Sequence, residues 1–237
     1  MARPTLDGFT SALREAAGDN LVALFLFGSA ARGDYDGKRS DLNTVVILTS
    51  ASPDALRPLA APVTRWVRGG QPAPLIFSEP GWRSSTDVFP IELEDMRDAH
   101  RMLAGRDPFD GLETTPADLR RELEREARGK LIQLRAAFVA AEADGKELGR
   151  LLETSAKTFF VLFRAAVRLK EGSPPAAHPT LVERMAEVAG IDAGAFDWVV
   201  GRLAGEKRPN LGDYDPLGER YVAALEHFVH WVDEQTE

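Results

Sequence analysis

Residues 21–29 read LVALFLFGS, and this stretch decides the fold of the first half of the chain. A compact apolar run that ends at Gly28-Ser29 is typical of a buried strand entering a tight turn. If a short helix follows the turn, backbone N–H groups and the Ser29 hydroxyl point at one spot. The stretch therefore predicts a buried strand and, directly after it, a site that favours phosphate.

Short apolar runs alternate with helical patterns on both sides of this strand, as far as about Gly111. Before it, apolar residues from Leu6 to Ala16 recur at helical spacing. After it, Ser52-Pro53 supplies an N-cap and a first helical residue. Further strands are predicted at Asn43 to Leu48, Pro74 to Phe77, Ile91 to Met96 and His100 to Ala104. This half of the chain is therefore expected to be an α/β unit.

The strand signals stop after about Glu113, and the rest of the sequence has helical periodicity. Thr115-Pro116 begins a long amphipathic pattern whose apolar residues follow one another at steps of three or four. Further helices are predicted at about Lys146 to Leu169, Thr180 to Ala189, Ala193 to Ala204 and Gly218 to Thr236. We therefore predict two domains, 1–112 and 113–237, the second an all-α helical bundle.

Composition excludes several classes of protein. The 237 residues are 44% hydrophobic and 28% charged, as in an ordinary globular protein. Without cysteines there can be no disulfide, thiolate nucleophile or iron–sulfur centre, so any metal must bind to oxygen or imidazole. The net charge of −8 argues against long nucleic acid as a partner. No signal-peptide apolar region or membrane span is recognisable, and we expect a cytoplasmic protein without a membrane partner.

Polar residues around the Gly28-Ser29 turn suggest a magnesium–nucleotide site. Arg32, three positions after Ser29, could add a guanidinium on the same side. Asp41 and Asn43 are two residues apart at the start of a predicted strand, so their side chains leave the same face. Glu92 would supply a third polar group from the predicted strand at 91–96. Three oxygen ligands beside a phosphate cradle are what Mg²⁺ with a nucleotide requires.

These motifs resemble those of the polymerase-β-like nucleotidyltransferase superfamily, in particular its two-domain antibiotic nucleotidyltransferases of the kanamycin type. The resemblance rests on Gly28-Ser29, Arg32-Gly33, Ser40-Asp41 and the glutamate of Phe89-Pro90-Ile91-Glu92. It implies an α+β fold, in which a mixed sheet with helices on one face precedes a helical bundle. It also implies ATP or another nucleoside triphosphate as substrate, with Mg²⁺ as cofactor.

The resemblance assigns a role to each matching residue. Nucleotide phosphates would bind at Gly28, Ser29, Arg32, Ser40 and Lys130, and magnesium at Asp41, Asn43 and Glu92. In Glu126-Ala127-Arg128-Gly129-Lys130, Glu126 would be the base that deprotonates an acceptor hydroxyl. From the residues alone, Glu126 and Lys130 are equally well an exposed ion pair on a charged helix face, and Glu92 a solvated strand residue.

One position departs from the family pattern. The family carries an acidic pair spaced D-x-D or D-x-E, whereas this chain has Asn43 where the second carboxylate belongs. Two divalent ions about 3.5 to 4 Å apart need negative charge between them, and an amide oxygen ligates without supplying charge. Asp34, Asp36 and Glu94 are close enough in sequence to compensate. The departure predicts a weakened or one-metal enzyme, or a nucleotide binder that no longer catalyses.

Three functional hypotheses follow. In the first, the chain transfers a nucleoside monophosphate to a hydroxyl of a small, antibiotic-like acceptor. In the second, the fold persists as a nucleotide-binding or partner-binding module that has lost two-metal chemistry. In the third, the helical half is mainly an oligomer interface, which predicts a homodimer.

Overall fold

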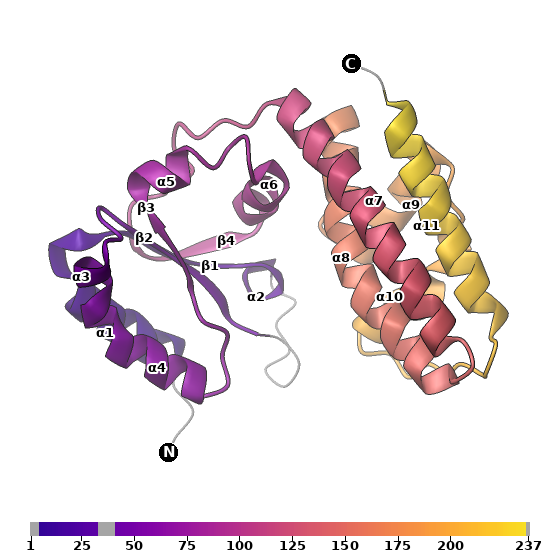
Figure 1. Cartoon of the computed structure of the whole chain (residues 1–237), viewed down its shortest axis with the longest axis horizontal. Helices are drawn as coiled ribbons and strands as arrows, with labels where there is room; N and C mark the ends of the chain where they lie inside the picture. Colours follow the sequence, from indigo (N-terminus) through magenta and orange to yellow (C-terminus); the bar gives the residue numbers. More distant parts are fainter. Residues whose placement is uncertain (1–4, 33–40, 236–237) are drawn as a thin grey trace. The chain divides into compact units, whose positions relative to one another are not determined.

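The computed structural model describes residues 5–32 and 41–235, which form two compact units, Met1–Thr115 and Pro116–Glu237. Figure 1 labels the helices and strands of both. The first unit contains α1 (Leu6–Ala17), β1 (Leu21–Phe27), α2 (Ser29–Arg32), β2 (Asn43–Leu48), α3 (Pro53–Leu56), α4 (Ala60–Arg68), β3 (Leu75–Ser78), α5 (Glu79–Arg83), α6 (Pro90–Asp98) and β4 (His100–Gly105), with short 3₁₀ turns at Gly18–Asn20 and Arg57–Leu59.

The regular elements described in the second unit are all helices, as the sequence predicted. It contains α7 (Pro116–Ala141), α8 (Gly145–Glu171), α9 (His178–Ala189), a 3₁₀ turn at Ala193–Ala195, α10 (Asp197–Leu203) and α11 (Pro216–Glu234).

Local chemistry explains where several helices begin. Ser52 caps α3 by accepting a hydrogen bond from the Ala55 N–H, and Pro53 takes the first helical position, as predicted. Asp144 caps α8 in the same way by accepting from the N–H groups of Lys146 and Glu147. These side chains satisfy backbone donors that a helix leaves unpaired at its start.

The four strands form one mixed sheet in the order β3-β2-β1-β4. The apolar strand β1 lies inside the sheet, antiparallel to both β2 and β4. The edge strand β3 runs parallel to β2, with Val45 opposite Leu75. The predicted strands at 21–27, 43–48, 74–77 and 100–104 are thus confirmed to within a residue or two.

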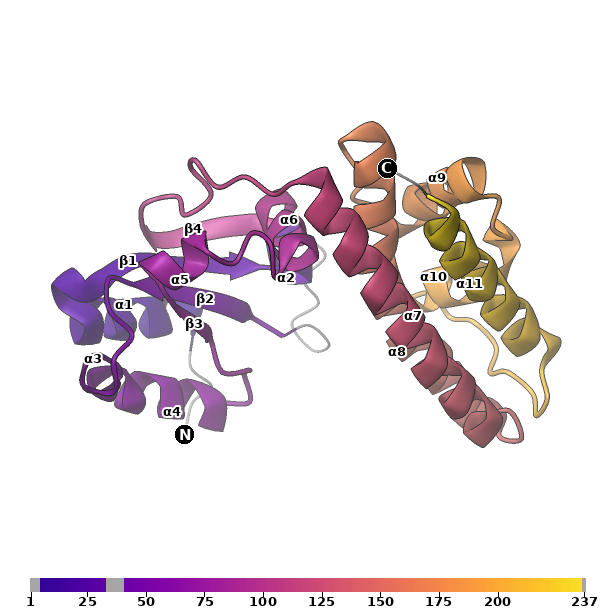
Figure 2. The same cartoon turned by 45° about the horizontal axis from the view of Figure 1, so that its top comes forward.

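Helices cover both faces of this sheet, so the expectation of helices on one face is wrong (Figure 2). On one face, Leu24, Val46 and Leu48 pack against Phe9 and Leu13 of α1, with Trp66 of α4 in the same cluster. The other face packs against α5 and α6. The physical reason lies in the strands: both alternating sets of side chains in β1 and β2 are apolar, and each must be removed from water.

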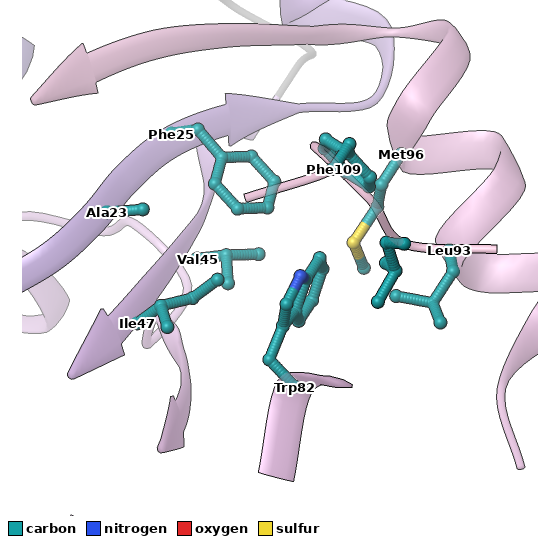
Figure 3. Close-up of a cluster of buried hydrophobic side chains, with 9 residues drawn as sticks. Ala23, Phe25, Val45, Ile47, Trp82, Leu93, Met96 and Phe109 are labelled. Carbon is teal, nitrogen blue, oxygen red and sulfur yellow. The ribbon is translucent and has the colours of Figure 1, made fainter. Parts of the chain in front are cut away.

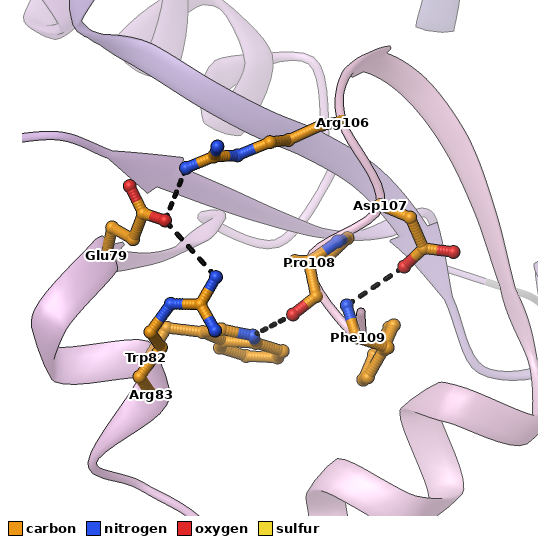
Figure 4. Close-up of polar contacts among 7 residues, drawn as sticks. All are labelled: Glu79, Trp82, Arg83, Arg106, Asp107, Pro108 and Phe109. Atoms are coloured by element: carbon orange, nitrogen blue, oxygen red, sulfur yellow. Dashed lines mark hydrogen bonds and ion pairs between the residues drawn. The ribbon is translucent and has the colours of Figure 1, made fainter. Parts of the chain in front are cut away.

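The second cluster is built around Trp82 of α5 (Figure 3). Its ring meets Phe25 edge-on, with centroids 5.8 Å apart, and Phe109 likewise at 5.5 Å. The Trp82 indole N–H donates to the Pro108 carbonyl at 2.9 Å, so the polar end of this 2% exposed side chain is also satisfied (Figure 4). Glu79 of α5 accepts from Arg106 nearby, which ties the segment after β4 to the start of α5.

The predicted strand at Ile91 to Met96 is wrong, because these residues belong to helix α6. The alternation of Ile91 and Leu93 fits a strand, but the buried positions also recur at three-residue spacing, from Ile91 to Glu94 and from Leu93 to Met96. Pro90 lies in the first turn of α6, where its missing N–H costs nothing and its fixed φ favours helix. A short apolar run is ambiguous in this way whenever both periods fit.

The helical unit has an aromatic core. Phe163 of α8 meets Phe228 of α11 edge-on at 4.8 Å and Phe196 at 5.5 Å, and all three side chains are fully buried. Tyr221 of α11 is buried beside Phe196, and its hydroxyl lies 3.0 Å from the Ser155 hydroxyl of α8. Burial raises the pKa of the Tyr221 phenol well above its ordinary value of 10.0, while the hydrogen bond to Ser155 acts in the opposite direction.

This phenol predicts a loss of stability in alkali. Below pH 10 both the folded and the unfolded chain keep the Tyr221 proton, whereas above pH 10 only the folded chain does. The free energy of unfolding should then fall by up to about 1.4 kcal/mol per pH unit from this group alone. Denaturant unfolding of the wild type and Tyr221→Phe at pH values on both sides of 10 measures this contribution.

The Tyr221→Phe variant should lose less stability than the wild type over that pH interval, because it has no phenol to ionise. Tyr214→Phe is the matched control, since Tyr214 is 69% exposed and should behave as the wild type does. Equal losses in Tyr221→Phe and the wild type would contradict the prediction.

Candidate functional site

The Gly28-Ser29 turn lies at the end of β1, as the sequence predicted. Gly28 has a φ of 78°, a left-handed conformation that favours glycine. Its N–H donates to the Ala99 carbonyl at 3.2 Å, and its carbonyl accepts from the N–H groups of Ala31 and Arg32. These bonds turn the chain sharply from β1 into α2 and leave the Ser29 side chain exposed.

Asn43 lies beside this turn. In the antiparallel ladder Phe27 is opposite Asn43, so the end of β1 and the start of β2 are neighbours. A Cβ built on Gly28 would lie 3.8 Å from the Asn43 side-chain nitrogen. Asn43 shares a face of the sheet with Val45 and Ile47, the face that α5 and α6 cover. The structure thus brings two of the predicted site residues together.

Asp41 precedes Asn43 and is exposed. The residue between them, Leu42, donates its N–H to the side-chain oxygen of Gln71 at 3.0 Å, and Gln71 is only 4% exposed. This contact fixes the start of β2 against the segment that leads into the parallel strand β3. That segment, residues 71–74, reads QPAP and therefore brings an amide to this end of the sheet but no carboxylate.

The Arg32 side chain is largely buried and forms an ion pair with Asp95. Its guanidinium donates to the Asp95 carboxylate at 2.6 Å and to the Asp95 carbonyl at 3.3 Å. The two side chains are 13% and 15% exposed. The pair ties α2 to α6, so in this arrangement the guanidinium neutralises Asp95, and any phosphate at the turn would compete with that carboxylate.

Glu92 is exposed in the first turn of α6, not on a strand of the sheet. Because consecutive helical residues are about 100° apart, Glu92 and Glu94 point in different directions and do not share one face as a strand would require. Glu94 is 5% exposed, pairs with Arg97 at 2.7 Å and accepts from the Thr114 hydroxyl at 2.6 Å. These contacts give Glu94 a part in the packing of α6.

The remaining predicted residues of this unit, Ser40, Asp34 and Asp36, lie outside the described residues. Within the ranges 5–32 and 41–235, no group of three or more histidine, aspartate or glutamate side chains is placed to hold a metal ion. Of the predicted magnesium ligands, those described at this end of the sheet are the carboxylate of Asp41 and the amide of Asn43. Mg²⁺ is commonly held by one or two carboxylates together with substrate phosphates, so this donor set fits a single ion but not a bridged pair.

Glu126 and Lys130 lie on α7 in the second unit. The Lys130 ammonium is 3.9 Å from the Glu126 carboxylate, and Arg125 approaches the same carboxylate at 3.1 Å. Their side chains are 28% exposed for Glu126 and 37% for Lys130. The exposed ion pair of the simpler interpretation is therefore present. A Cβ on the intervening Gly129 would meet nothing within 4 Å, so packing within the described residues does not require glycine there.

Sequence reasoning missed two residues that hold this site together, Gln71 and Asp95. Each acts on a residue far away in the chain, 29 positions in the Leu42–Gln71 bond and 63 in the Arg32–Asp95 pair. Neither lies in a motif, so no signal in the sequence indicates these contacts.

Among known proteins, no family model matches the chain, and no curated protein matches it at a significant level of sequence similarity. The resemblance to nucleotidyltransferases is therefore a hypothesis that rests on the residues described above. In the described part of the chain, none of the helices combines the length and the apolar character needed to cross a lipid bilayer.

Proposed function

We propose that the first unit binds the triphosphate of a magnesium nucleotide at the Gly28-Ser29 turn, and that the chain transfers a nucleoside monophosphate to a hydroxyl of a small acceptor. The observation that supports this best is the position of the turn beside Asn43, at the sheet end where Asp41 is exposed. Phosphate-binding groups and oxygen ligands for magnesium would then meet at one place. We assign this activity to the cytoplasm.

In this proposal each residue has one task. The Ser29 hydroxyl and the N–H groups at the turn donate to phosphate oxygens. The Asp41 carboxylate and the Asn43 amide oxygen hold one Mg²⁺, with Glu92 as a further carboxylate on α6. When bound, the ion would offset the charge of the phosphates. Glu126 takes the proton of the acceptor hydroxyl, and Lys130 offsets charge on the departing pyrophosphate.

A second function, nucleotide or partner binding without turnover, is favoured by a specific set of observations. Arg32 is held by Asp95, Glu92 is on a helix instead of the sheet, and position 43 carries an amide. The pair with Asp95 neutralises the Arg32 guanidinium, the helix takes Glu92 off the sheet from which a third ligand was expected, and the amide of Asn43 lacks the charge that a bridging carboxylate supplies. In this alternative the Gly28-Ser29 turn retains a nucleotide, but no phosphoryl group is transferred.

Calorimetric titration of the full chain with ATP, with and without magnesium, separates the two functions. The transferase predicts that magnesium strengthens ATP binding and that pyrophosphate is released when an aminoglycoside such as kanamycin is added as a hydroxyl acceptor. If the affinity for ATP is the same with and without magnesium and no pyrophosphate is released, the second function is supported. If ATP does not bind under either condition, the assignment of an ATP site to the Gly28-Ser29 turn is wrong in both functions.

A further inference from the structure

A cavity of about 190 Å³ lies within the helical unit, well away in sequence from the residues assigned to the nucleotide. Its wall is formed by the start of α8, by α10 and by the segment that follows α10. The polar and aromatic side chains that line it are Lys146, Arg150, Glu153, Trp198, Arg202 and Asn210. No role in nucleotide transfer uses any of them.

Two glycines on α8 allow Leu211 and Trp198, on the opposite side of the cavity, to approach the helix closely. A Cβ on Gly145 would be 2.0 Å from the Leu211 carbonyl oxygen, and one on Gly149 would be 3.0 Å from Cη2 of the Trp198 ring. The Trp198 indole N–H donates to the Pro209 carbonyl at 2.8 Å, which holds the ring in place. The aromatic wall of the cavity is therefore fixed before any ligand arrives, and a fixed wall lowers the cost of binding.

The lining is positively charged although the chain as a whole carries a net charge of −8. Three cations face one carboxylate, that of Glu153, which pairs with Arg202 at 2.8 Å. Arg202 also lies over the Trp198 ring, with its guanidinium carbon 5.6 Å from the ring centre. Glu153 is thereby neutralised, which leaves Lys146 and Arg150, two exposed cations of the lining.

These two cations differ in their surroundings. Arg150 pairs with Glu147 at 3.2 Å at the surface. Within the described residues, the Lys146 ammonium has no ion pair and the Asn210 amide has no hydrogen bond. Two further carboxylates near the start of α8 are engaged elsewhere: Asp144 accepts from backbone N–H groups of α8, and Asp213 accepts from the Gly145 N–H at 3.1 Å.

We propose that this cavity binds a small organic anion, whose phosphate or carboxylate group lies between Lys146 and Arg150 while its apolar part contacts Trp198. Cations with weak or absent pairing supply charge-assisted hydrogen bonds to such a group. A volume of about 190 Å³ is below that of pockets for drug-sized ligands, so the ligand is small. The Asn210 amide is available to hydrogen-bond with it.

Nuclear magnetic resonance of the full chain tests this site with phenyl phosphate as the probe. The Trp198 indole N–H signal, assigned by its loss in Trp198→Phe, should shift in a saturable way as phenyl phosphate is added. Raising the salt concentration should weaken the binding, because exposed charges are screened. Benzyl alcohol, which has the ring without the charge, should shift the signal far less, and inorganic phosphate alone should bind more weakly than the probe.

Neutralising the two cations identifies the site. Lys146→Gln combined with Arg150→Gln should weaken phenyl phosphate binding by at least tenfold. The matched control is Lys157→Gln with Arg121→Gln, which removes the same charge from exposed positions of the same unit. The proposal is overturned if phenyl phosphate gives no saturable shift at millimolar concentration, if benzyl alcohol binds equally well, or if both double variants weaken binding alike.

Discussion

Replacing Asp41 with alanine is expected to abolish nucleotidyl transfer and the magnesium dependence of ATP binding without unfolding the chain. Disturbing groups that merely support a metal ligand typically costs about 10- to 100-fold, so removing the carboxylate ligand itself should cost at least about 100-fold. Asp41 is exposed, and exposed substitutions usually change the unfolding free energy by less than about 0.5 kcal/mol. Pyrophosphate release, magnesium-dependent calorimetry and denaturant unfolding measure the three quantities.

Asp54→Ala is the control for this variant. Asp54 is also an exposed aspartate of the first unit, with 88% of its side chain accessible, and it pairs with the exposed Arg57 at 3.3 Å. It should keep wild-type binding and turnover. If Asp41→Ala keeps them too, the assignment of Asp41 as the magnesium ligand is refuted.

The second large effect is an expected gain in affinity for the magnesium nucleotide. Asn43→Asp should increase the affinity for ATP in the presence of magnesium by at least about tenfold, with little change when magnesium is absent. The substitution keeps the shape of the side chain beside Gly28 and adds the charge that a bridging ligand requires. Calorimetry with and without magnesium measures the gain, and the pyrophosphate assay shows whether turnover rises with it.

Asn43→Leu separates charge from shape, because leucine is similar in size to asparagine and carries no charge. It should show no gain. If both variants gain the same affinity for ATP, packing at the start of β2 is responsible. If Asn43→Asp binds ATP with magnesium no more tightly than the wild type does, no magnesium binds at this position.

Most of the secondary structure could be predicted from the sequence because the strongest patterns are local. The apolar run at 21–27 and the periodic pattern after Pro116 give β1 and α7 at nearly the expected bounds. Prediction failed at residues 91–96, where helix and strand periods both fit and burial against Trp82 and Phe109 decided the outcome. The apolar side chains on both faces of β1 and β2 require both faces to be covered, but which helices cover each face depends on how distant segments pack.

In the candidate site, too, some features could be predicted from the local sequence and others depend on contacts between distant residues. The turn at Gly28-Ser29 and the strand that begins at Asn43 were predicted from the sequence, whereas the antiparallel pairing that makes Gly28 and Asn43 neighbours is seen only in the structure. The ion pair of Arg32 with Asp95 and the support of Leu42 by Gln71 depend on the tertiary fold. The motif therefore predicted that Arg32 would lie near the turn, but it could not predict that Asp95 would already be its ion-pair partner.

The open position at Gly129 has a practical consequence for spectroscopy. The chain contains no cysteine, so a cysteine introduced at position 129 would be its single thiol and could carry one fluorophore or spin label. A Cβ there would meet nothing within 4 Å among the described residues outside its own helix backbone, and cysteine favours helix over glycine by roughly a few tenths of a kcal/mol. The label would be attached next to Lys130 on α7, where it would report on the motion and the surroundings of that part of the helix.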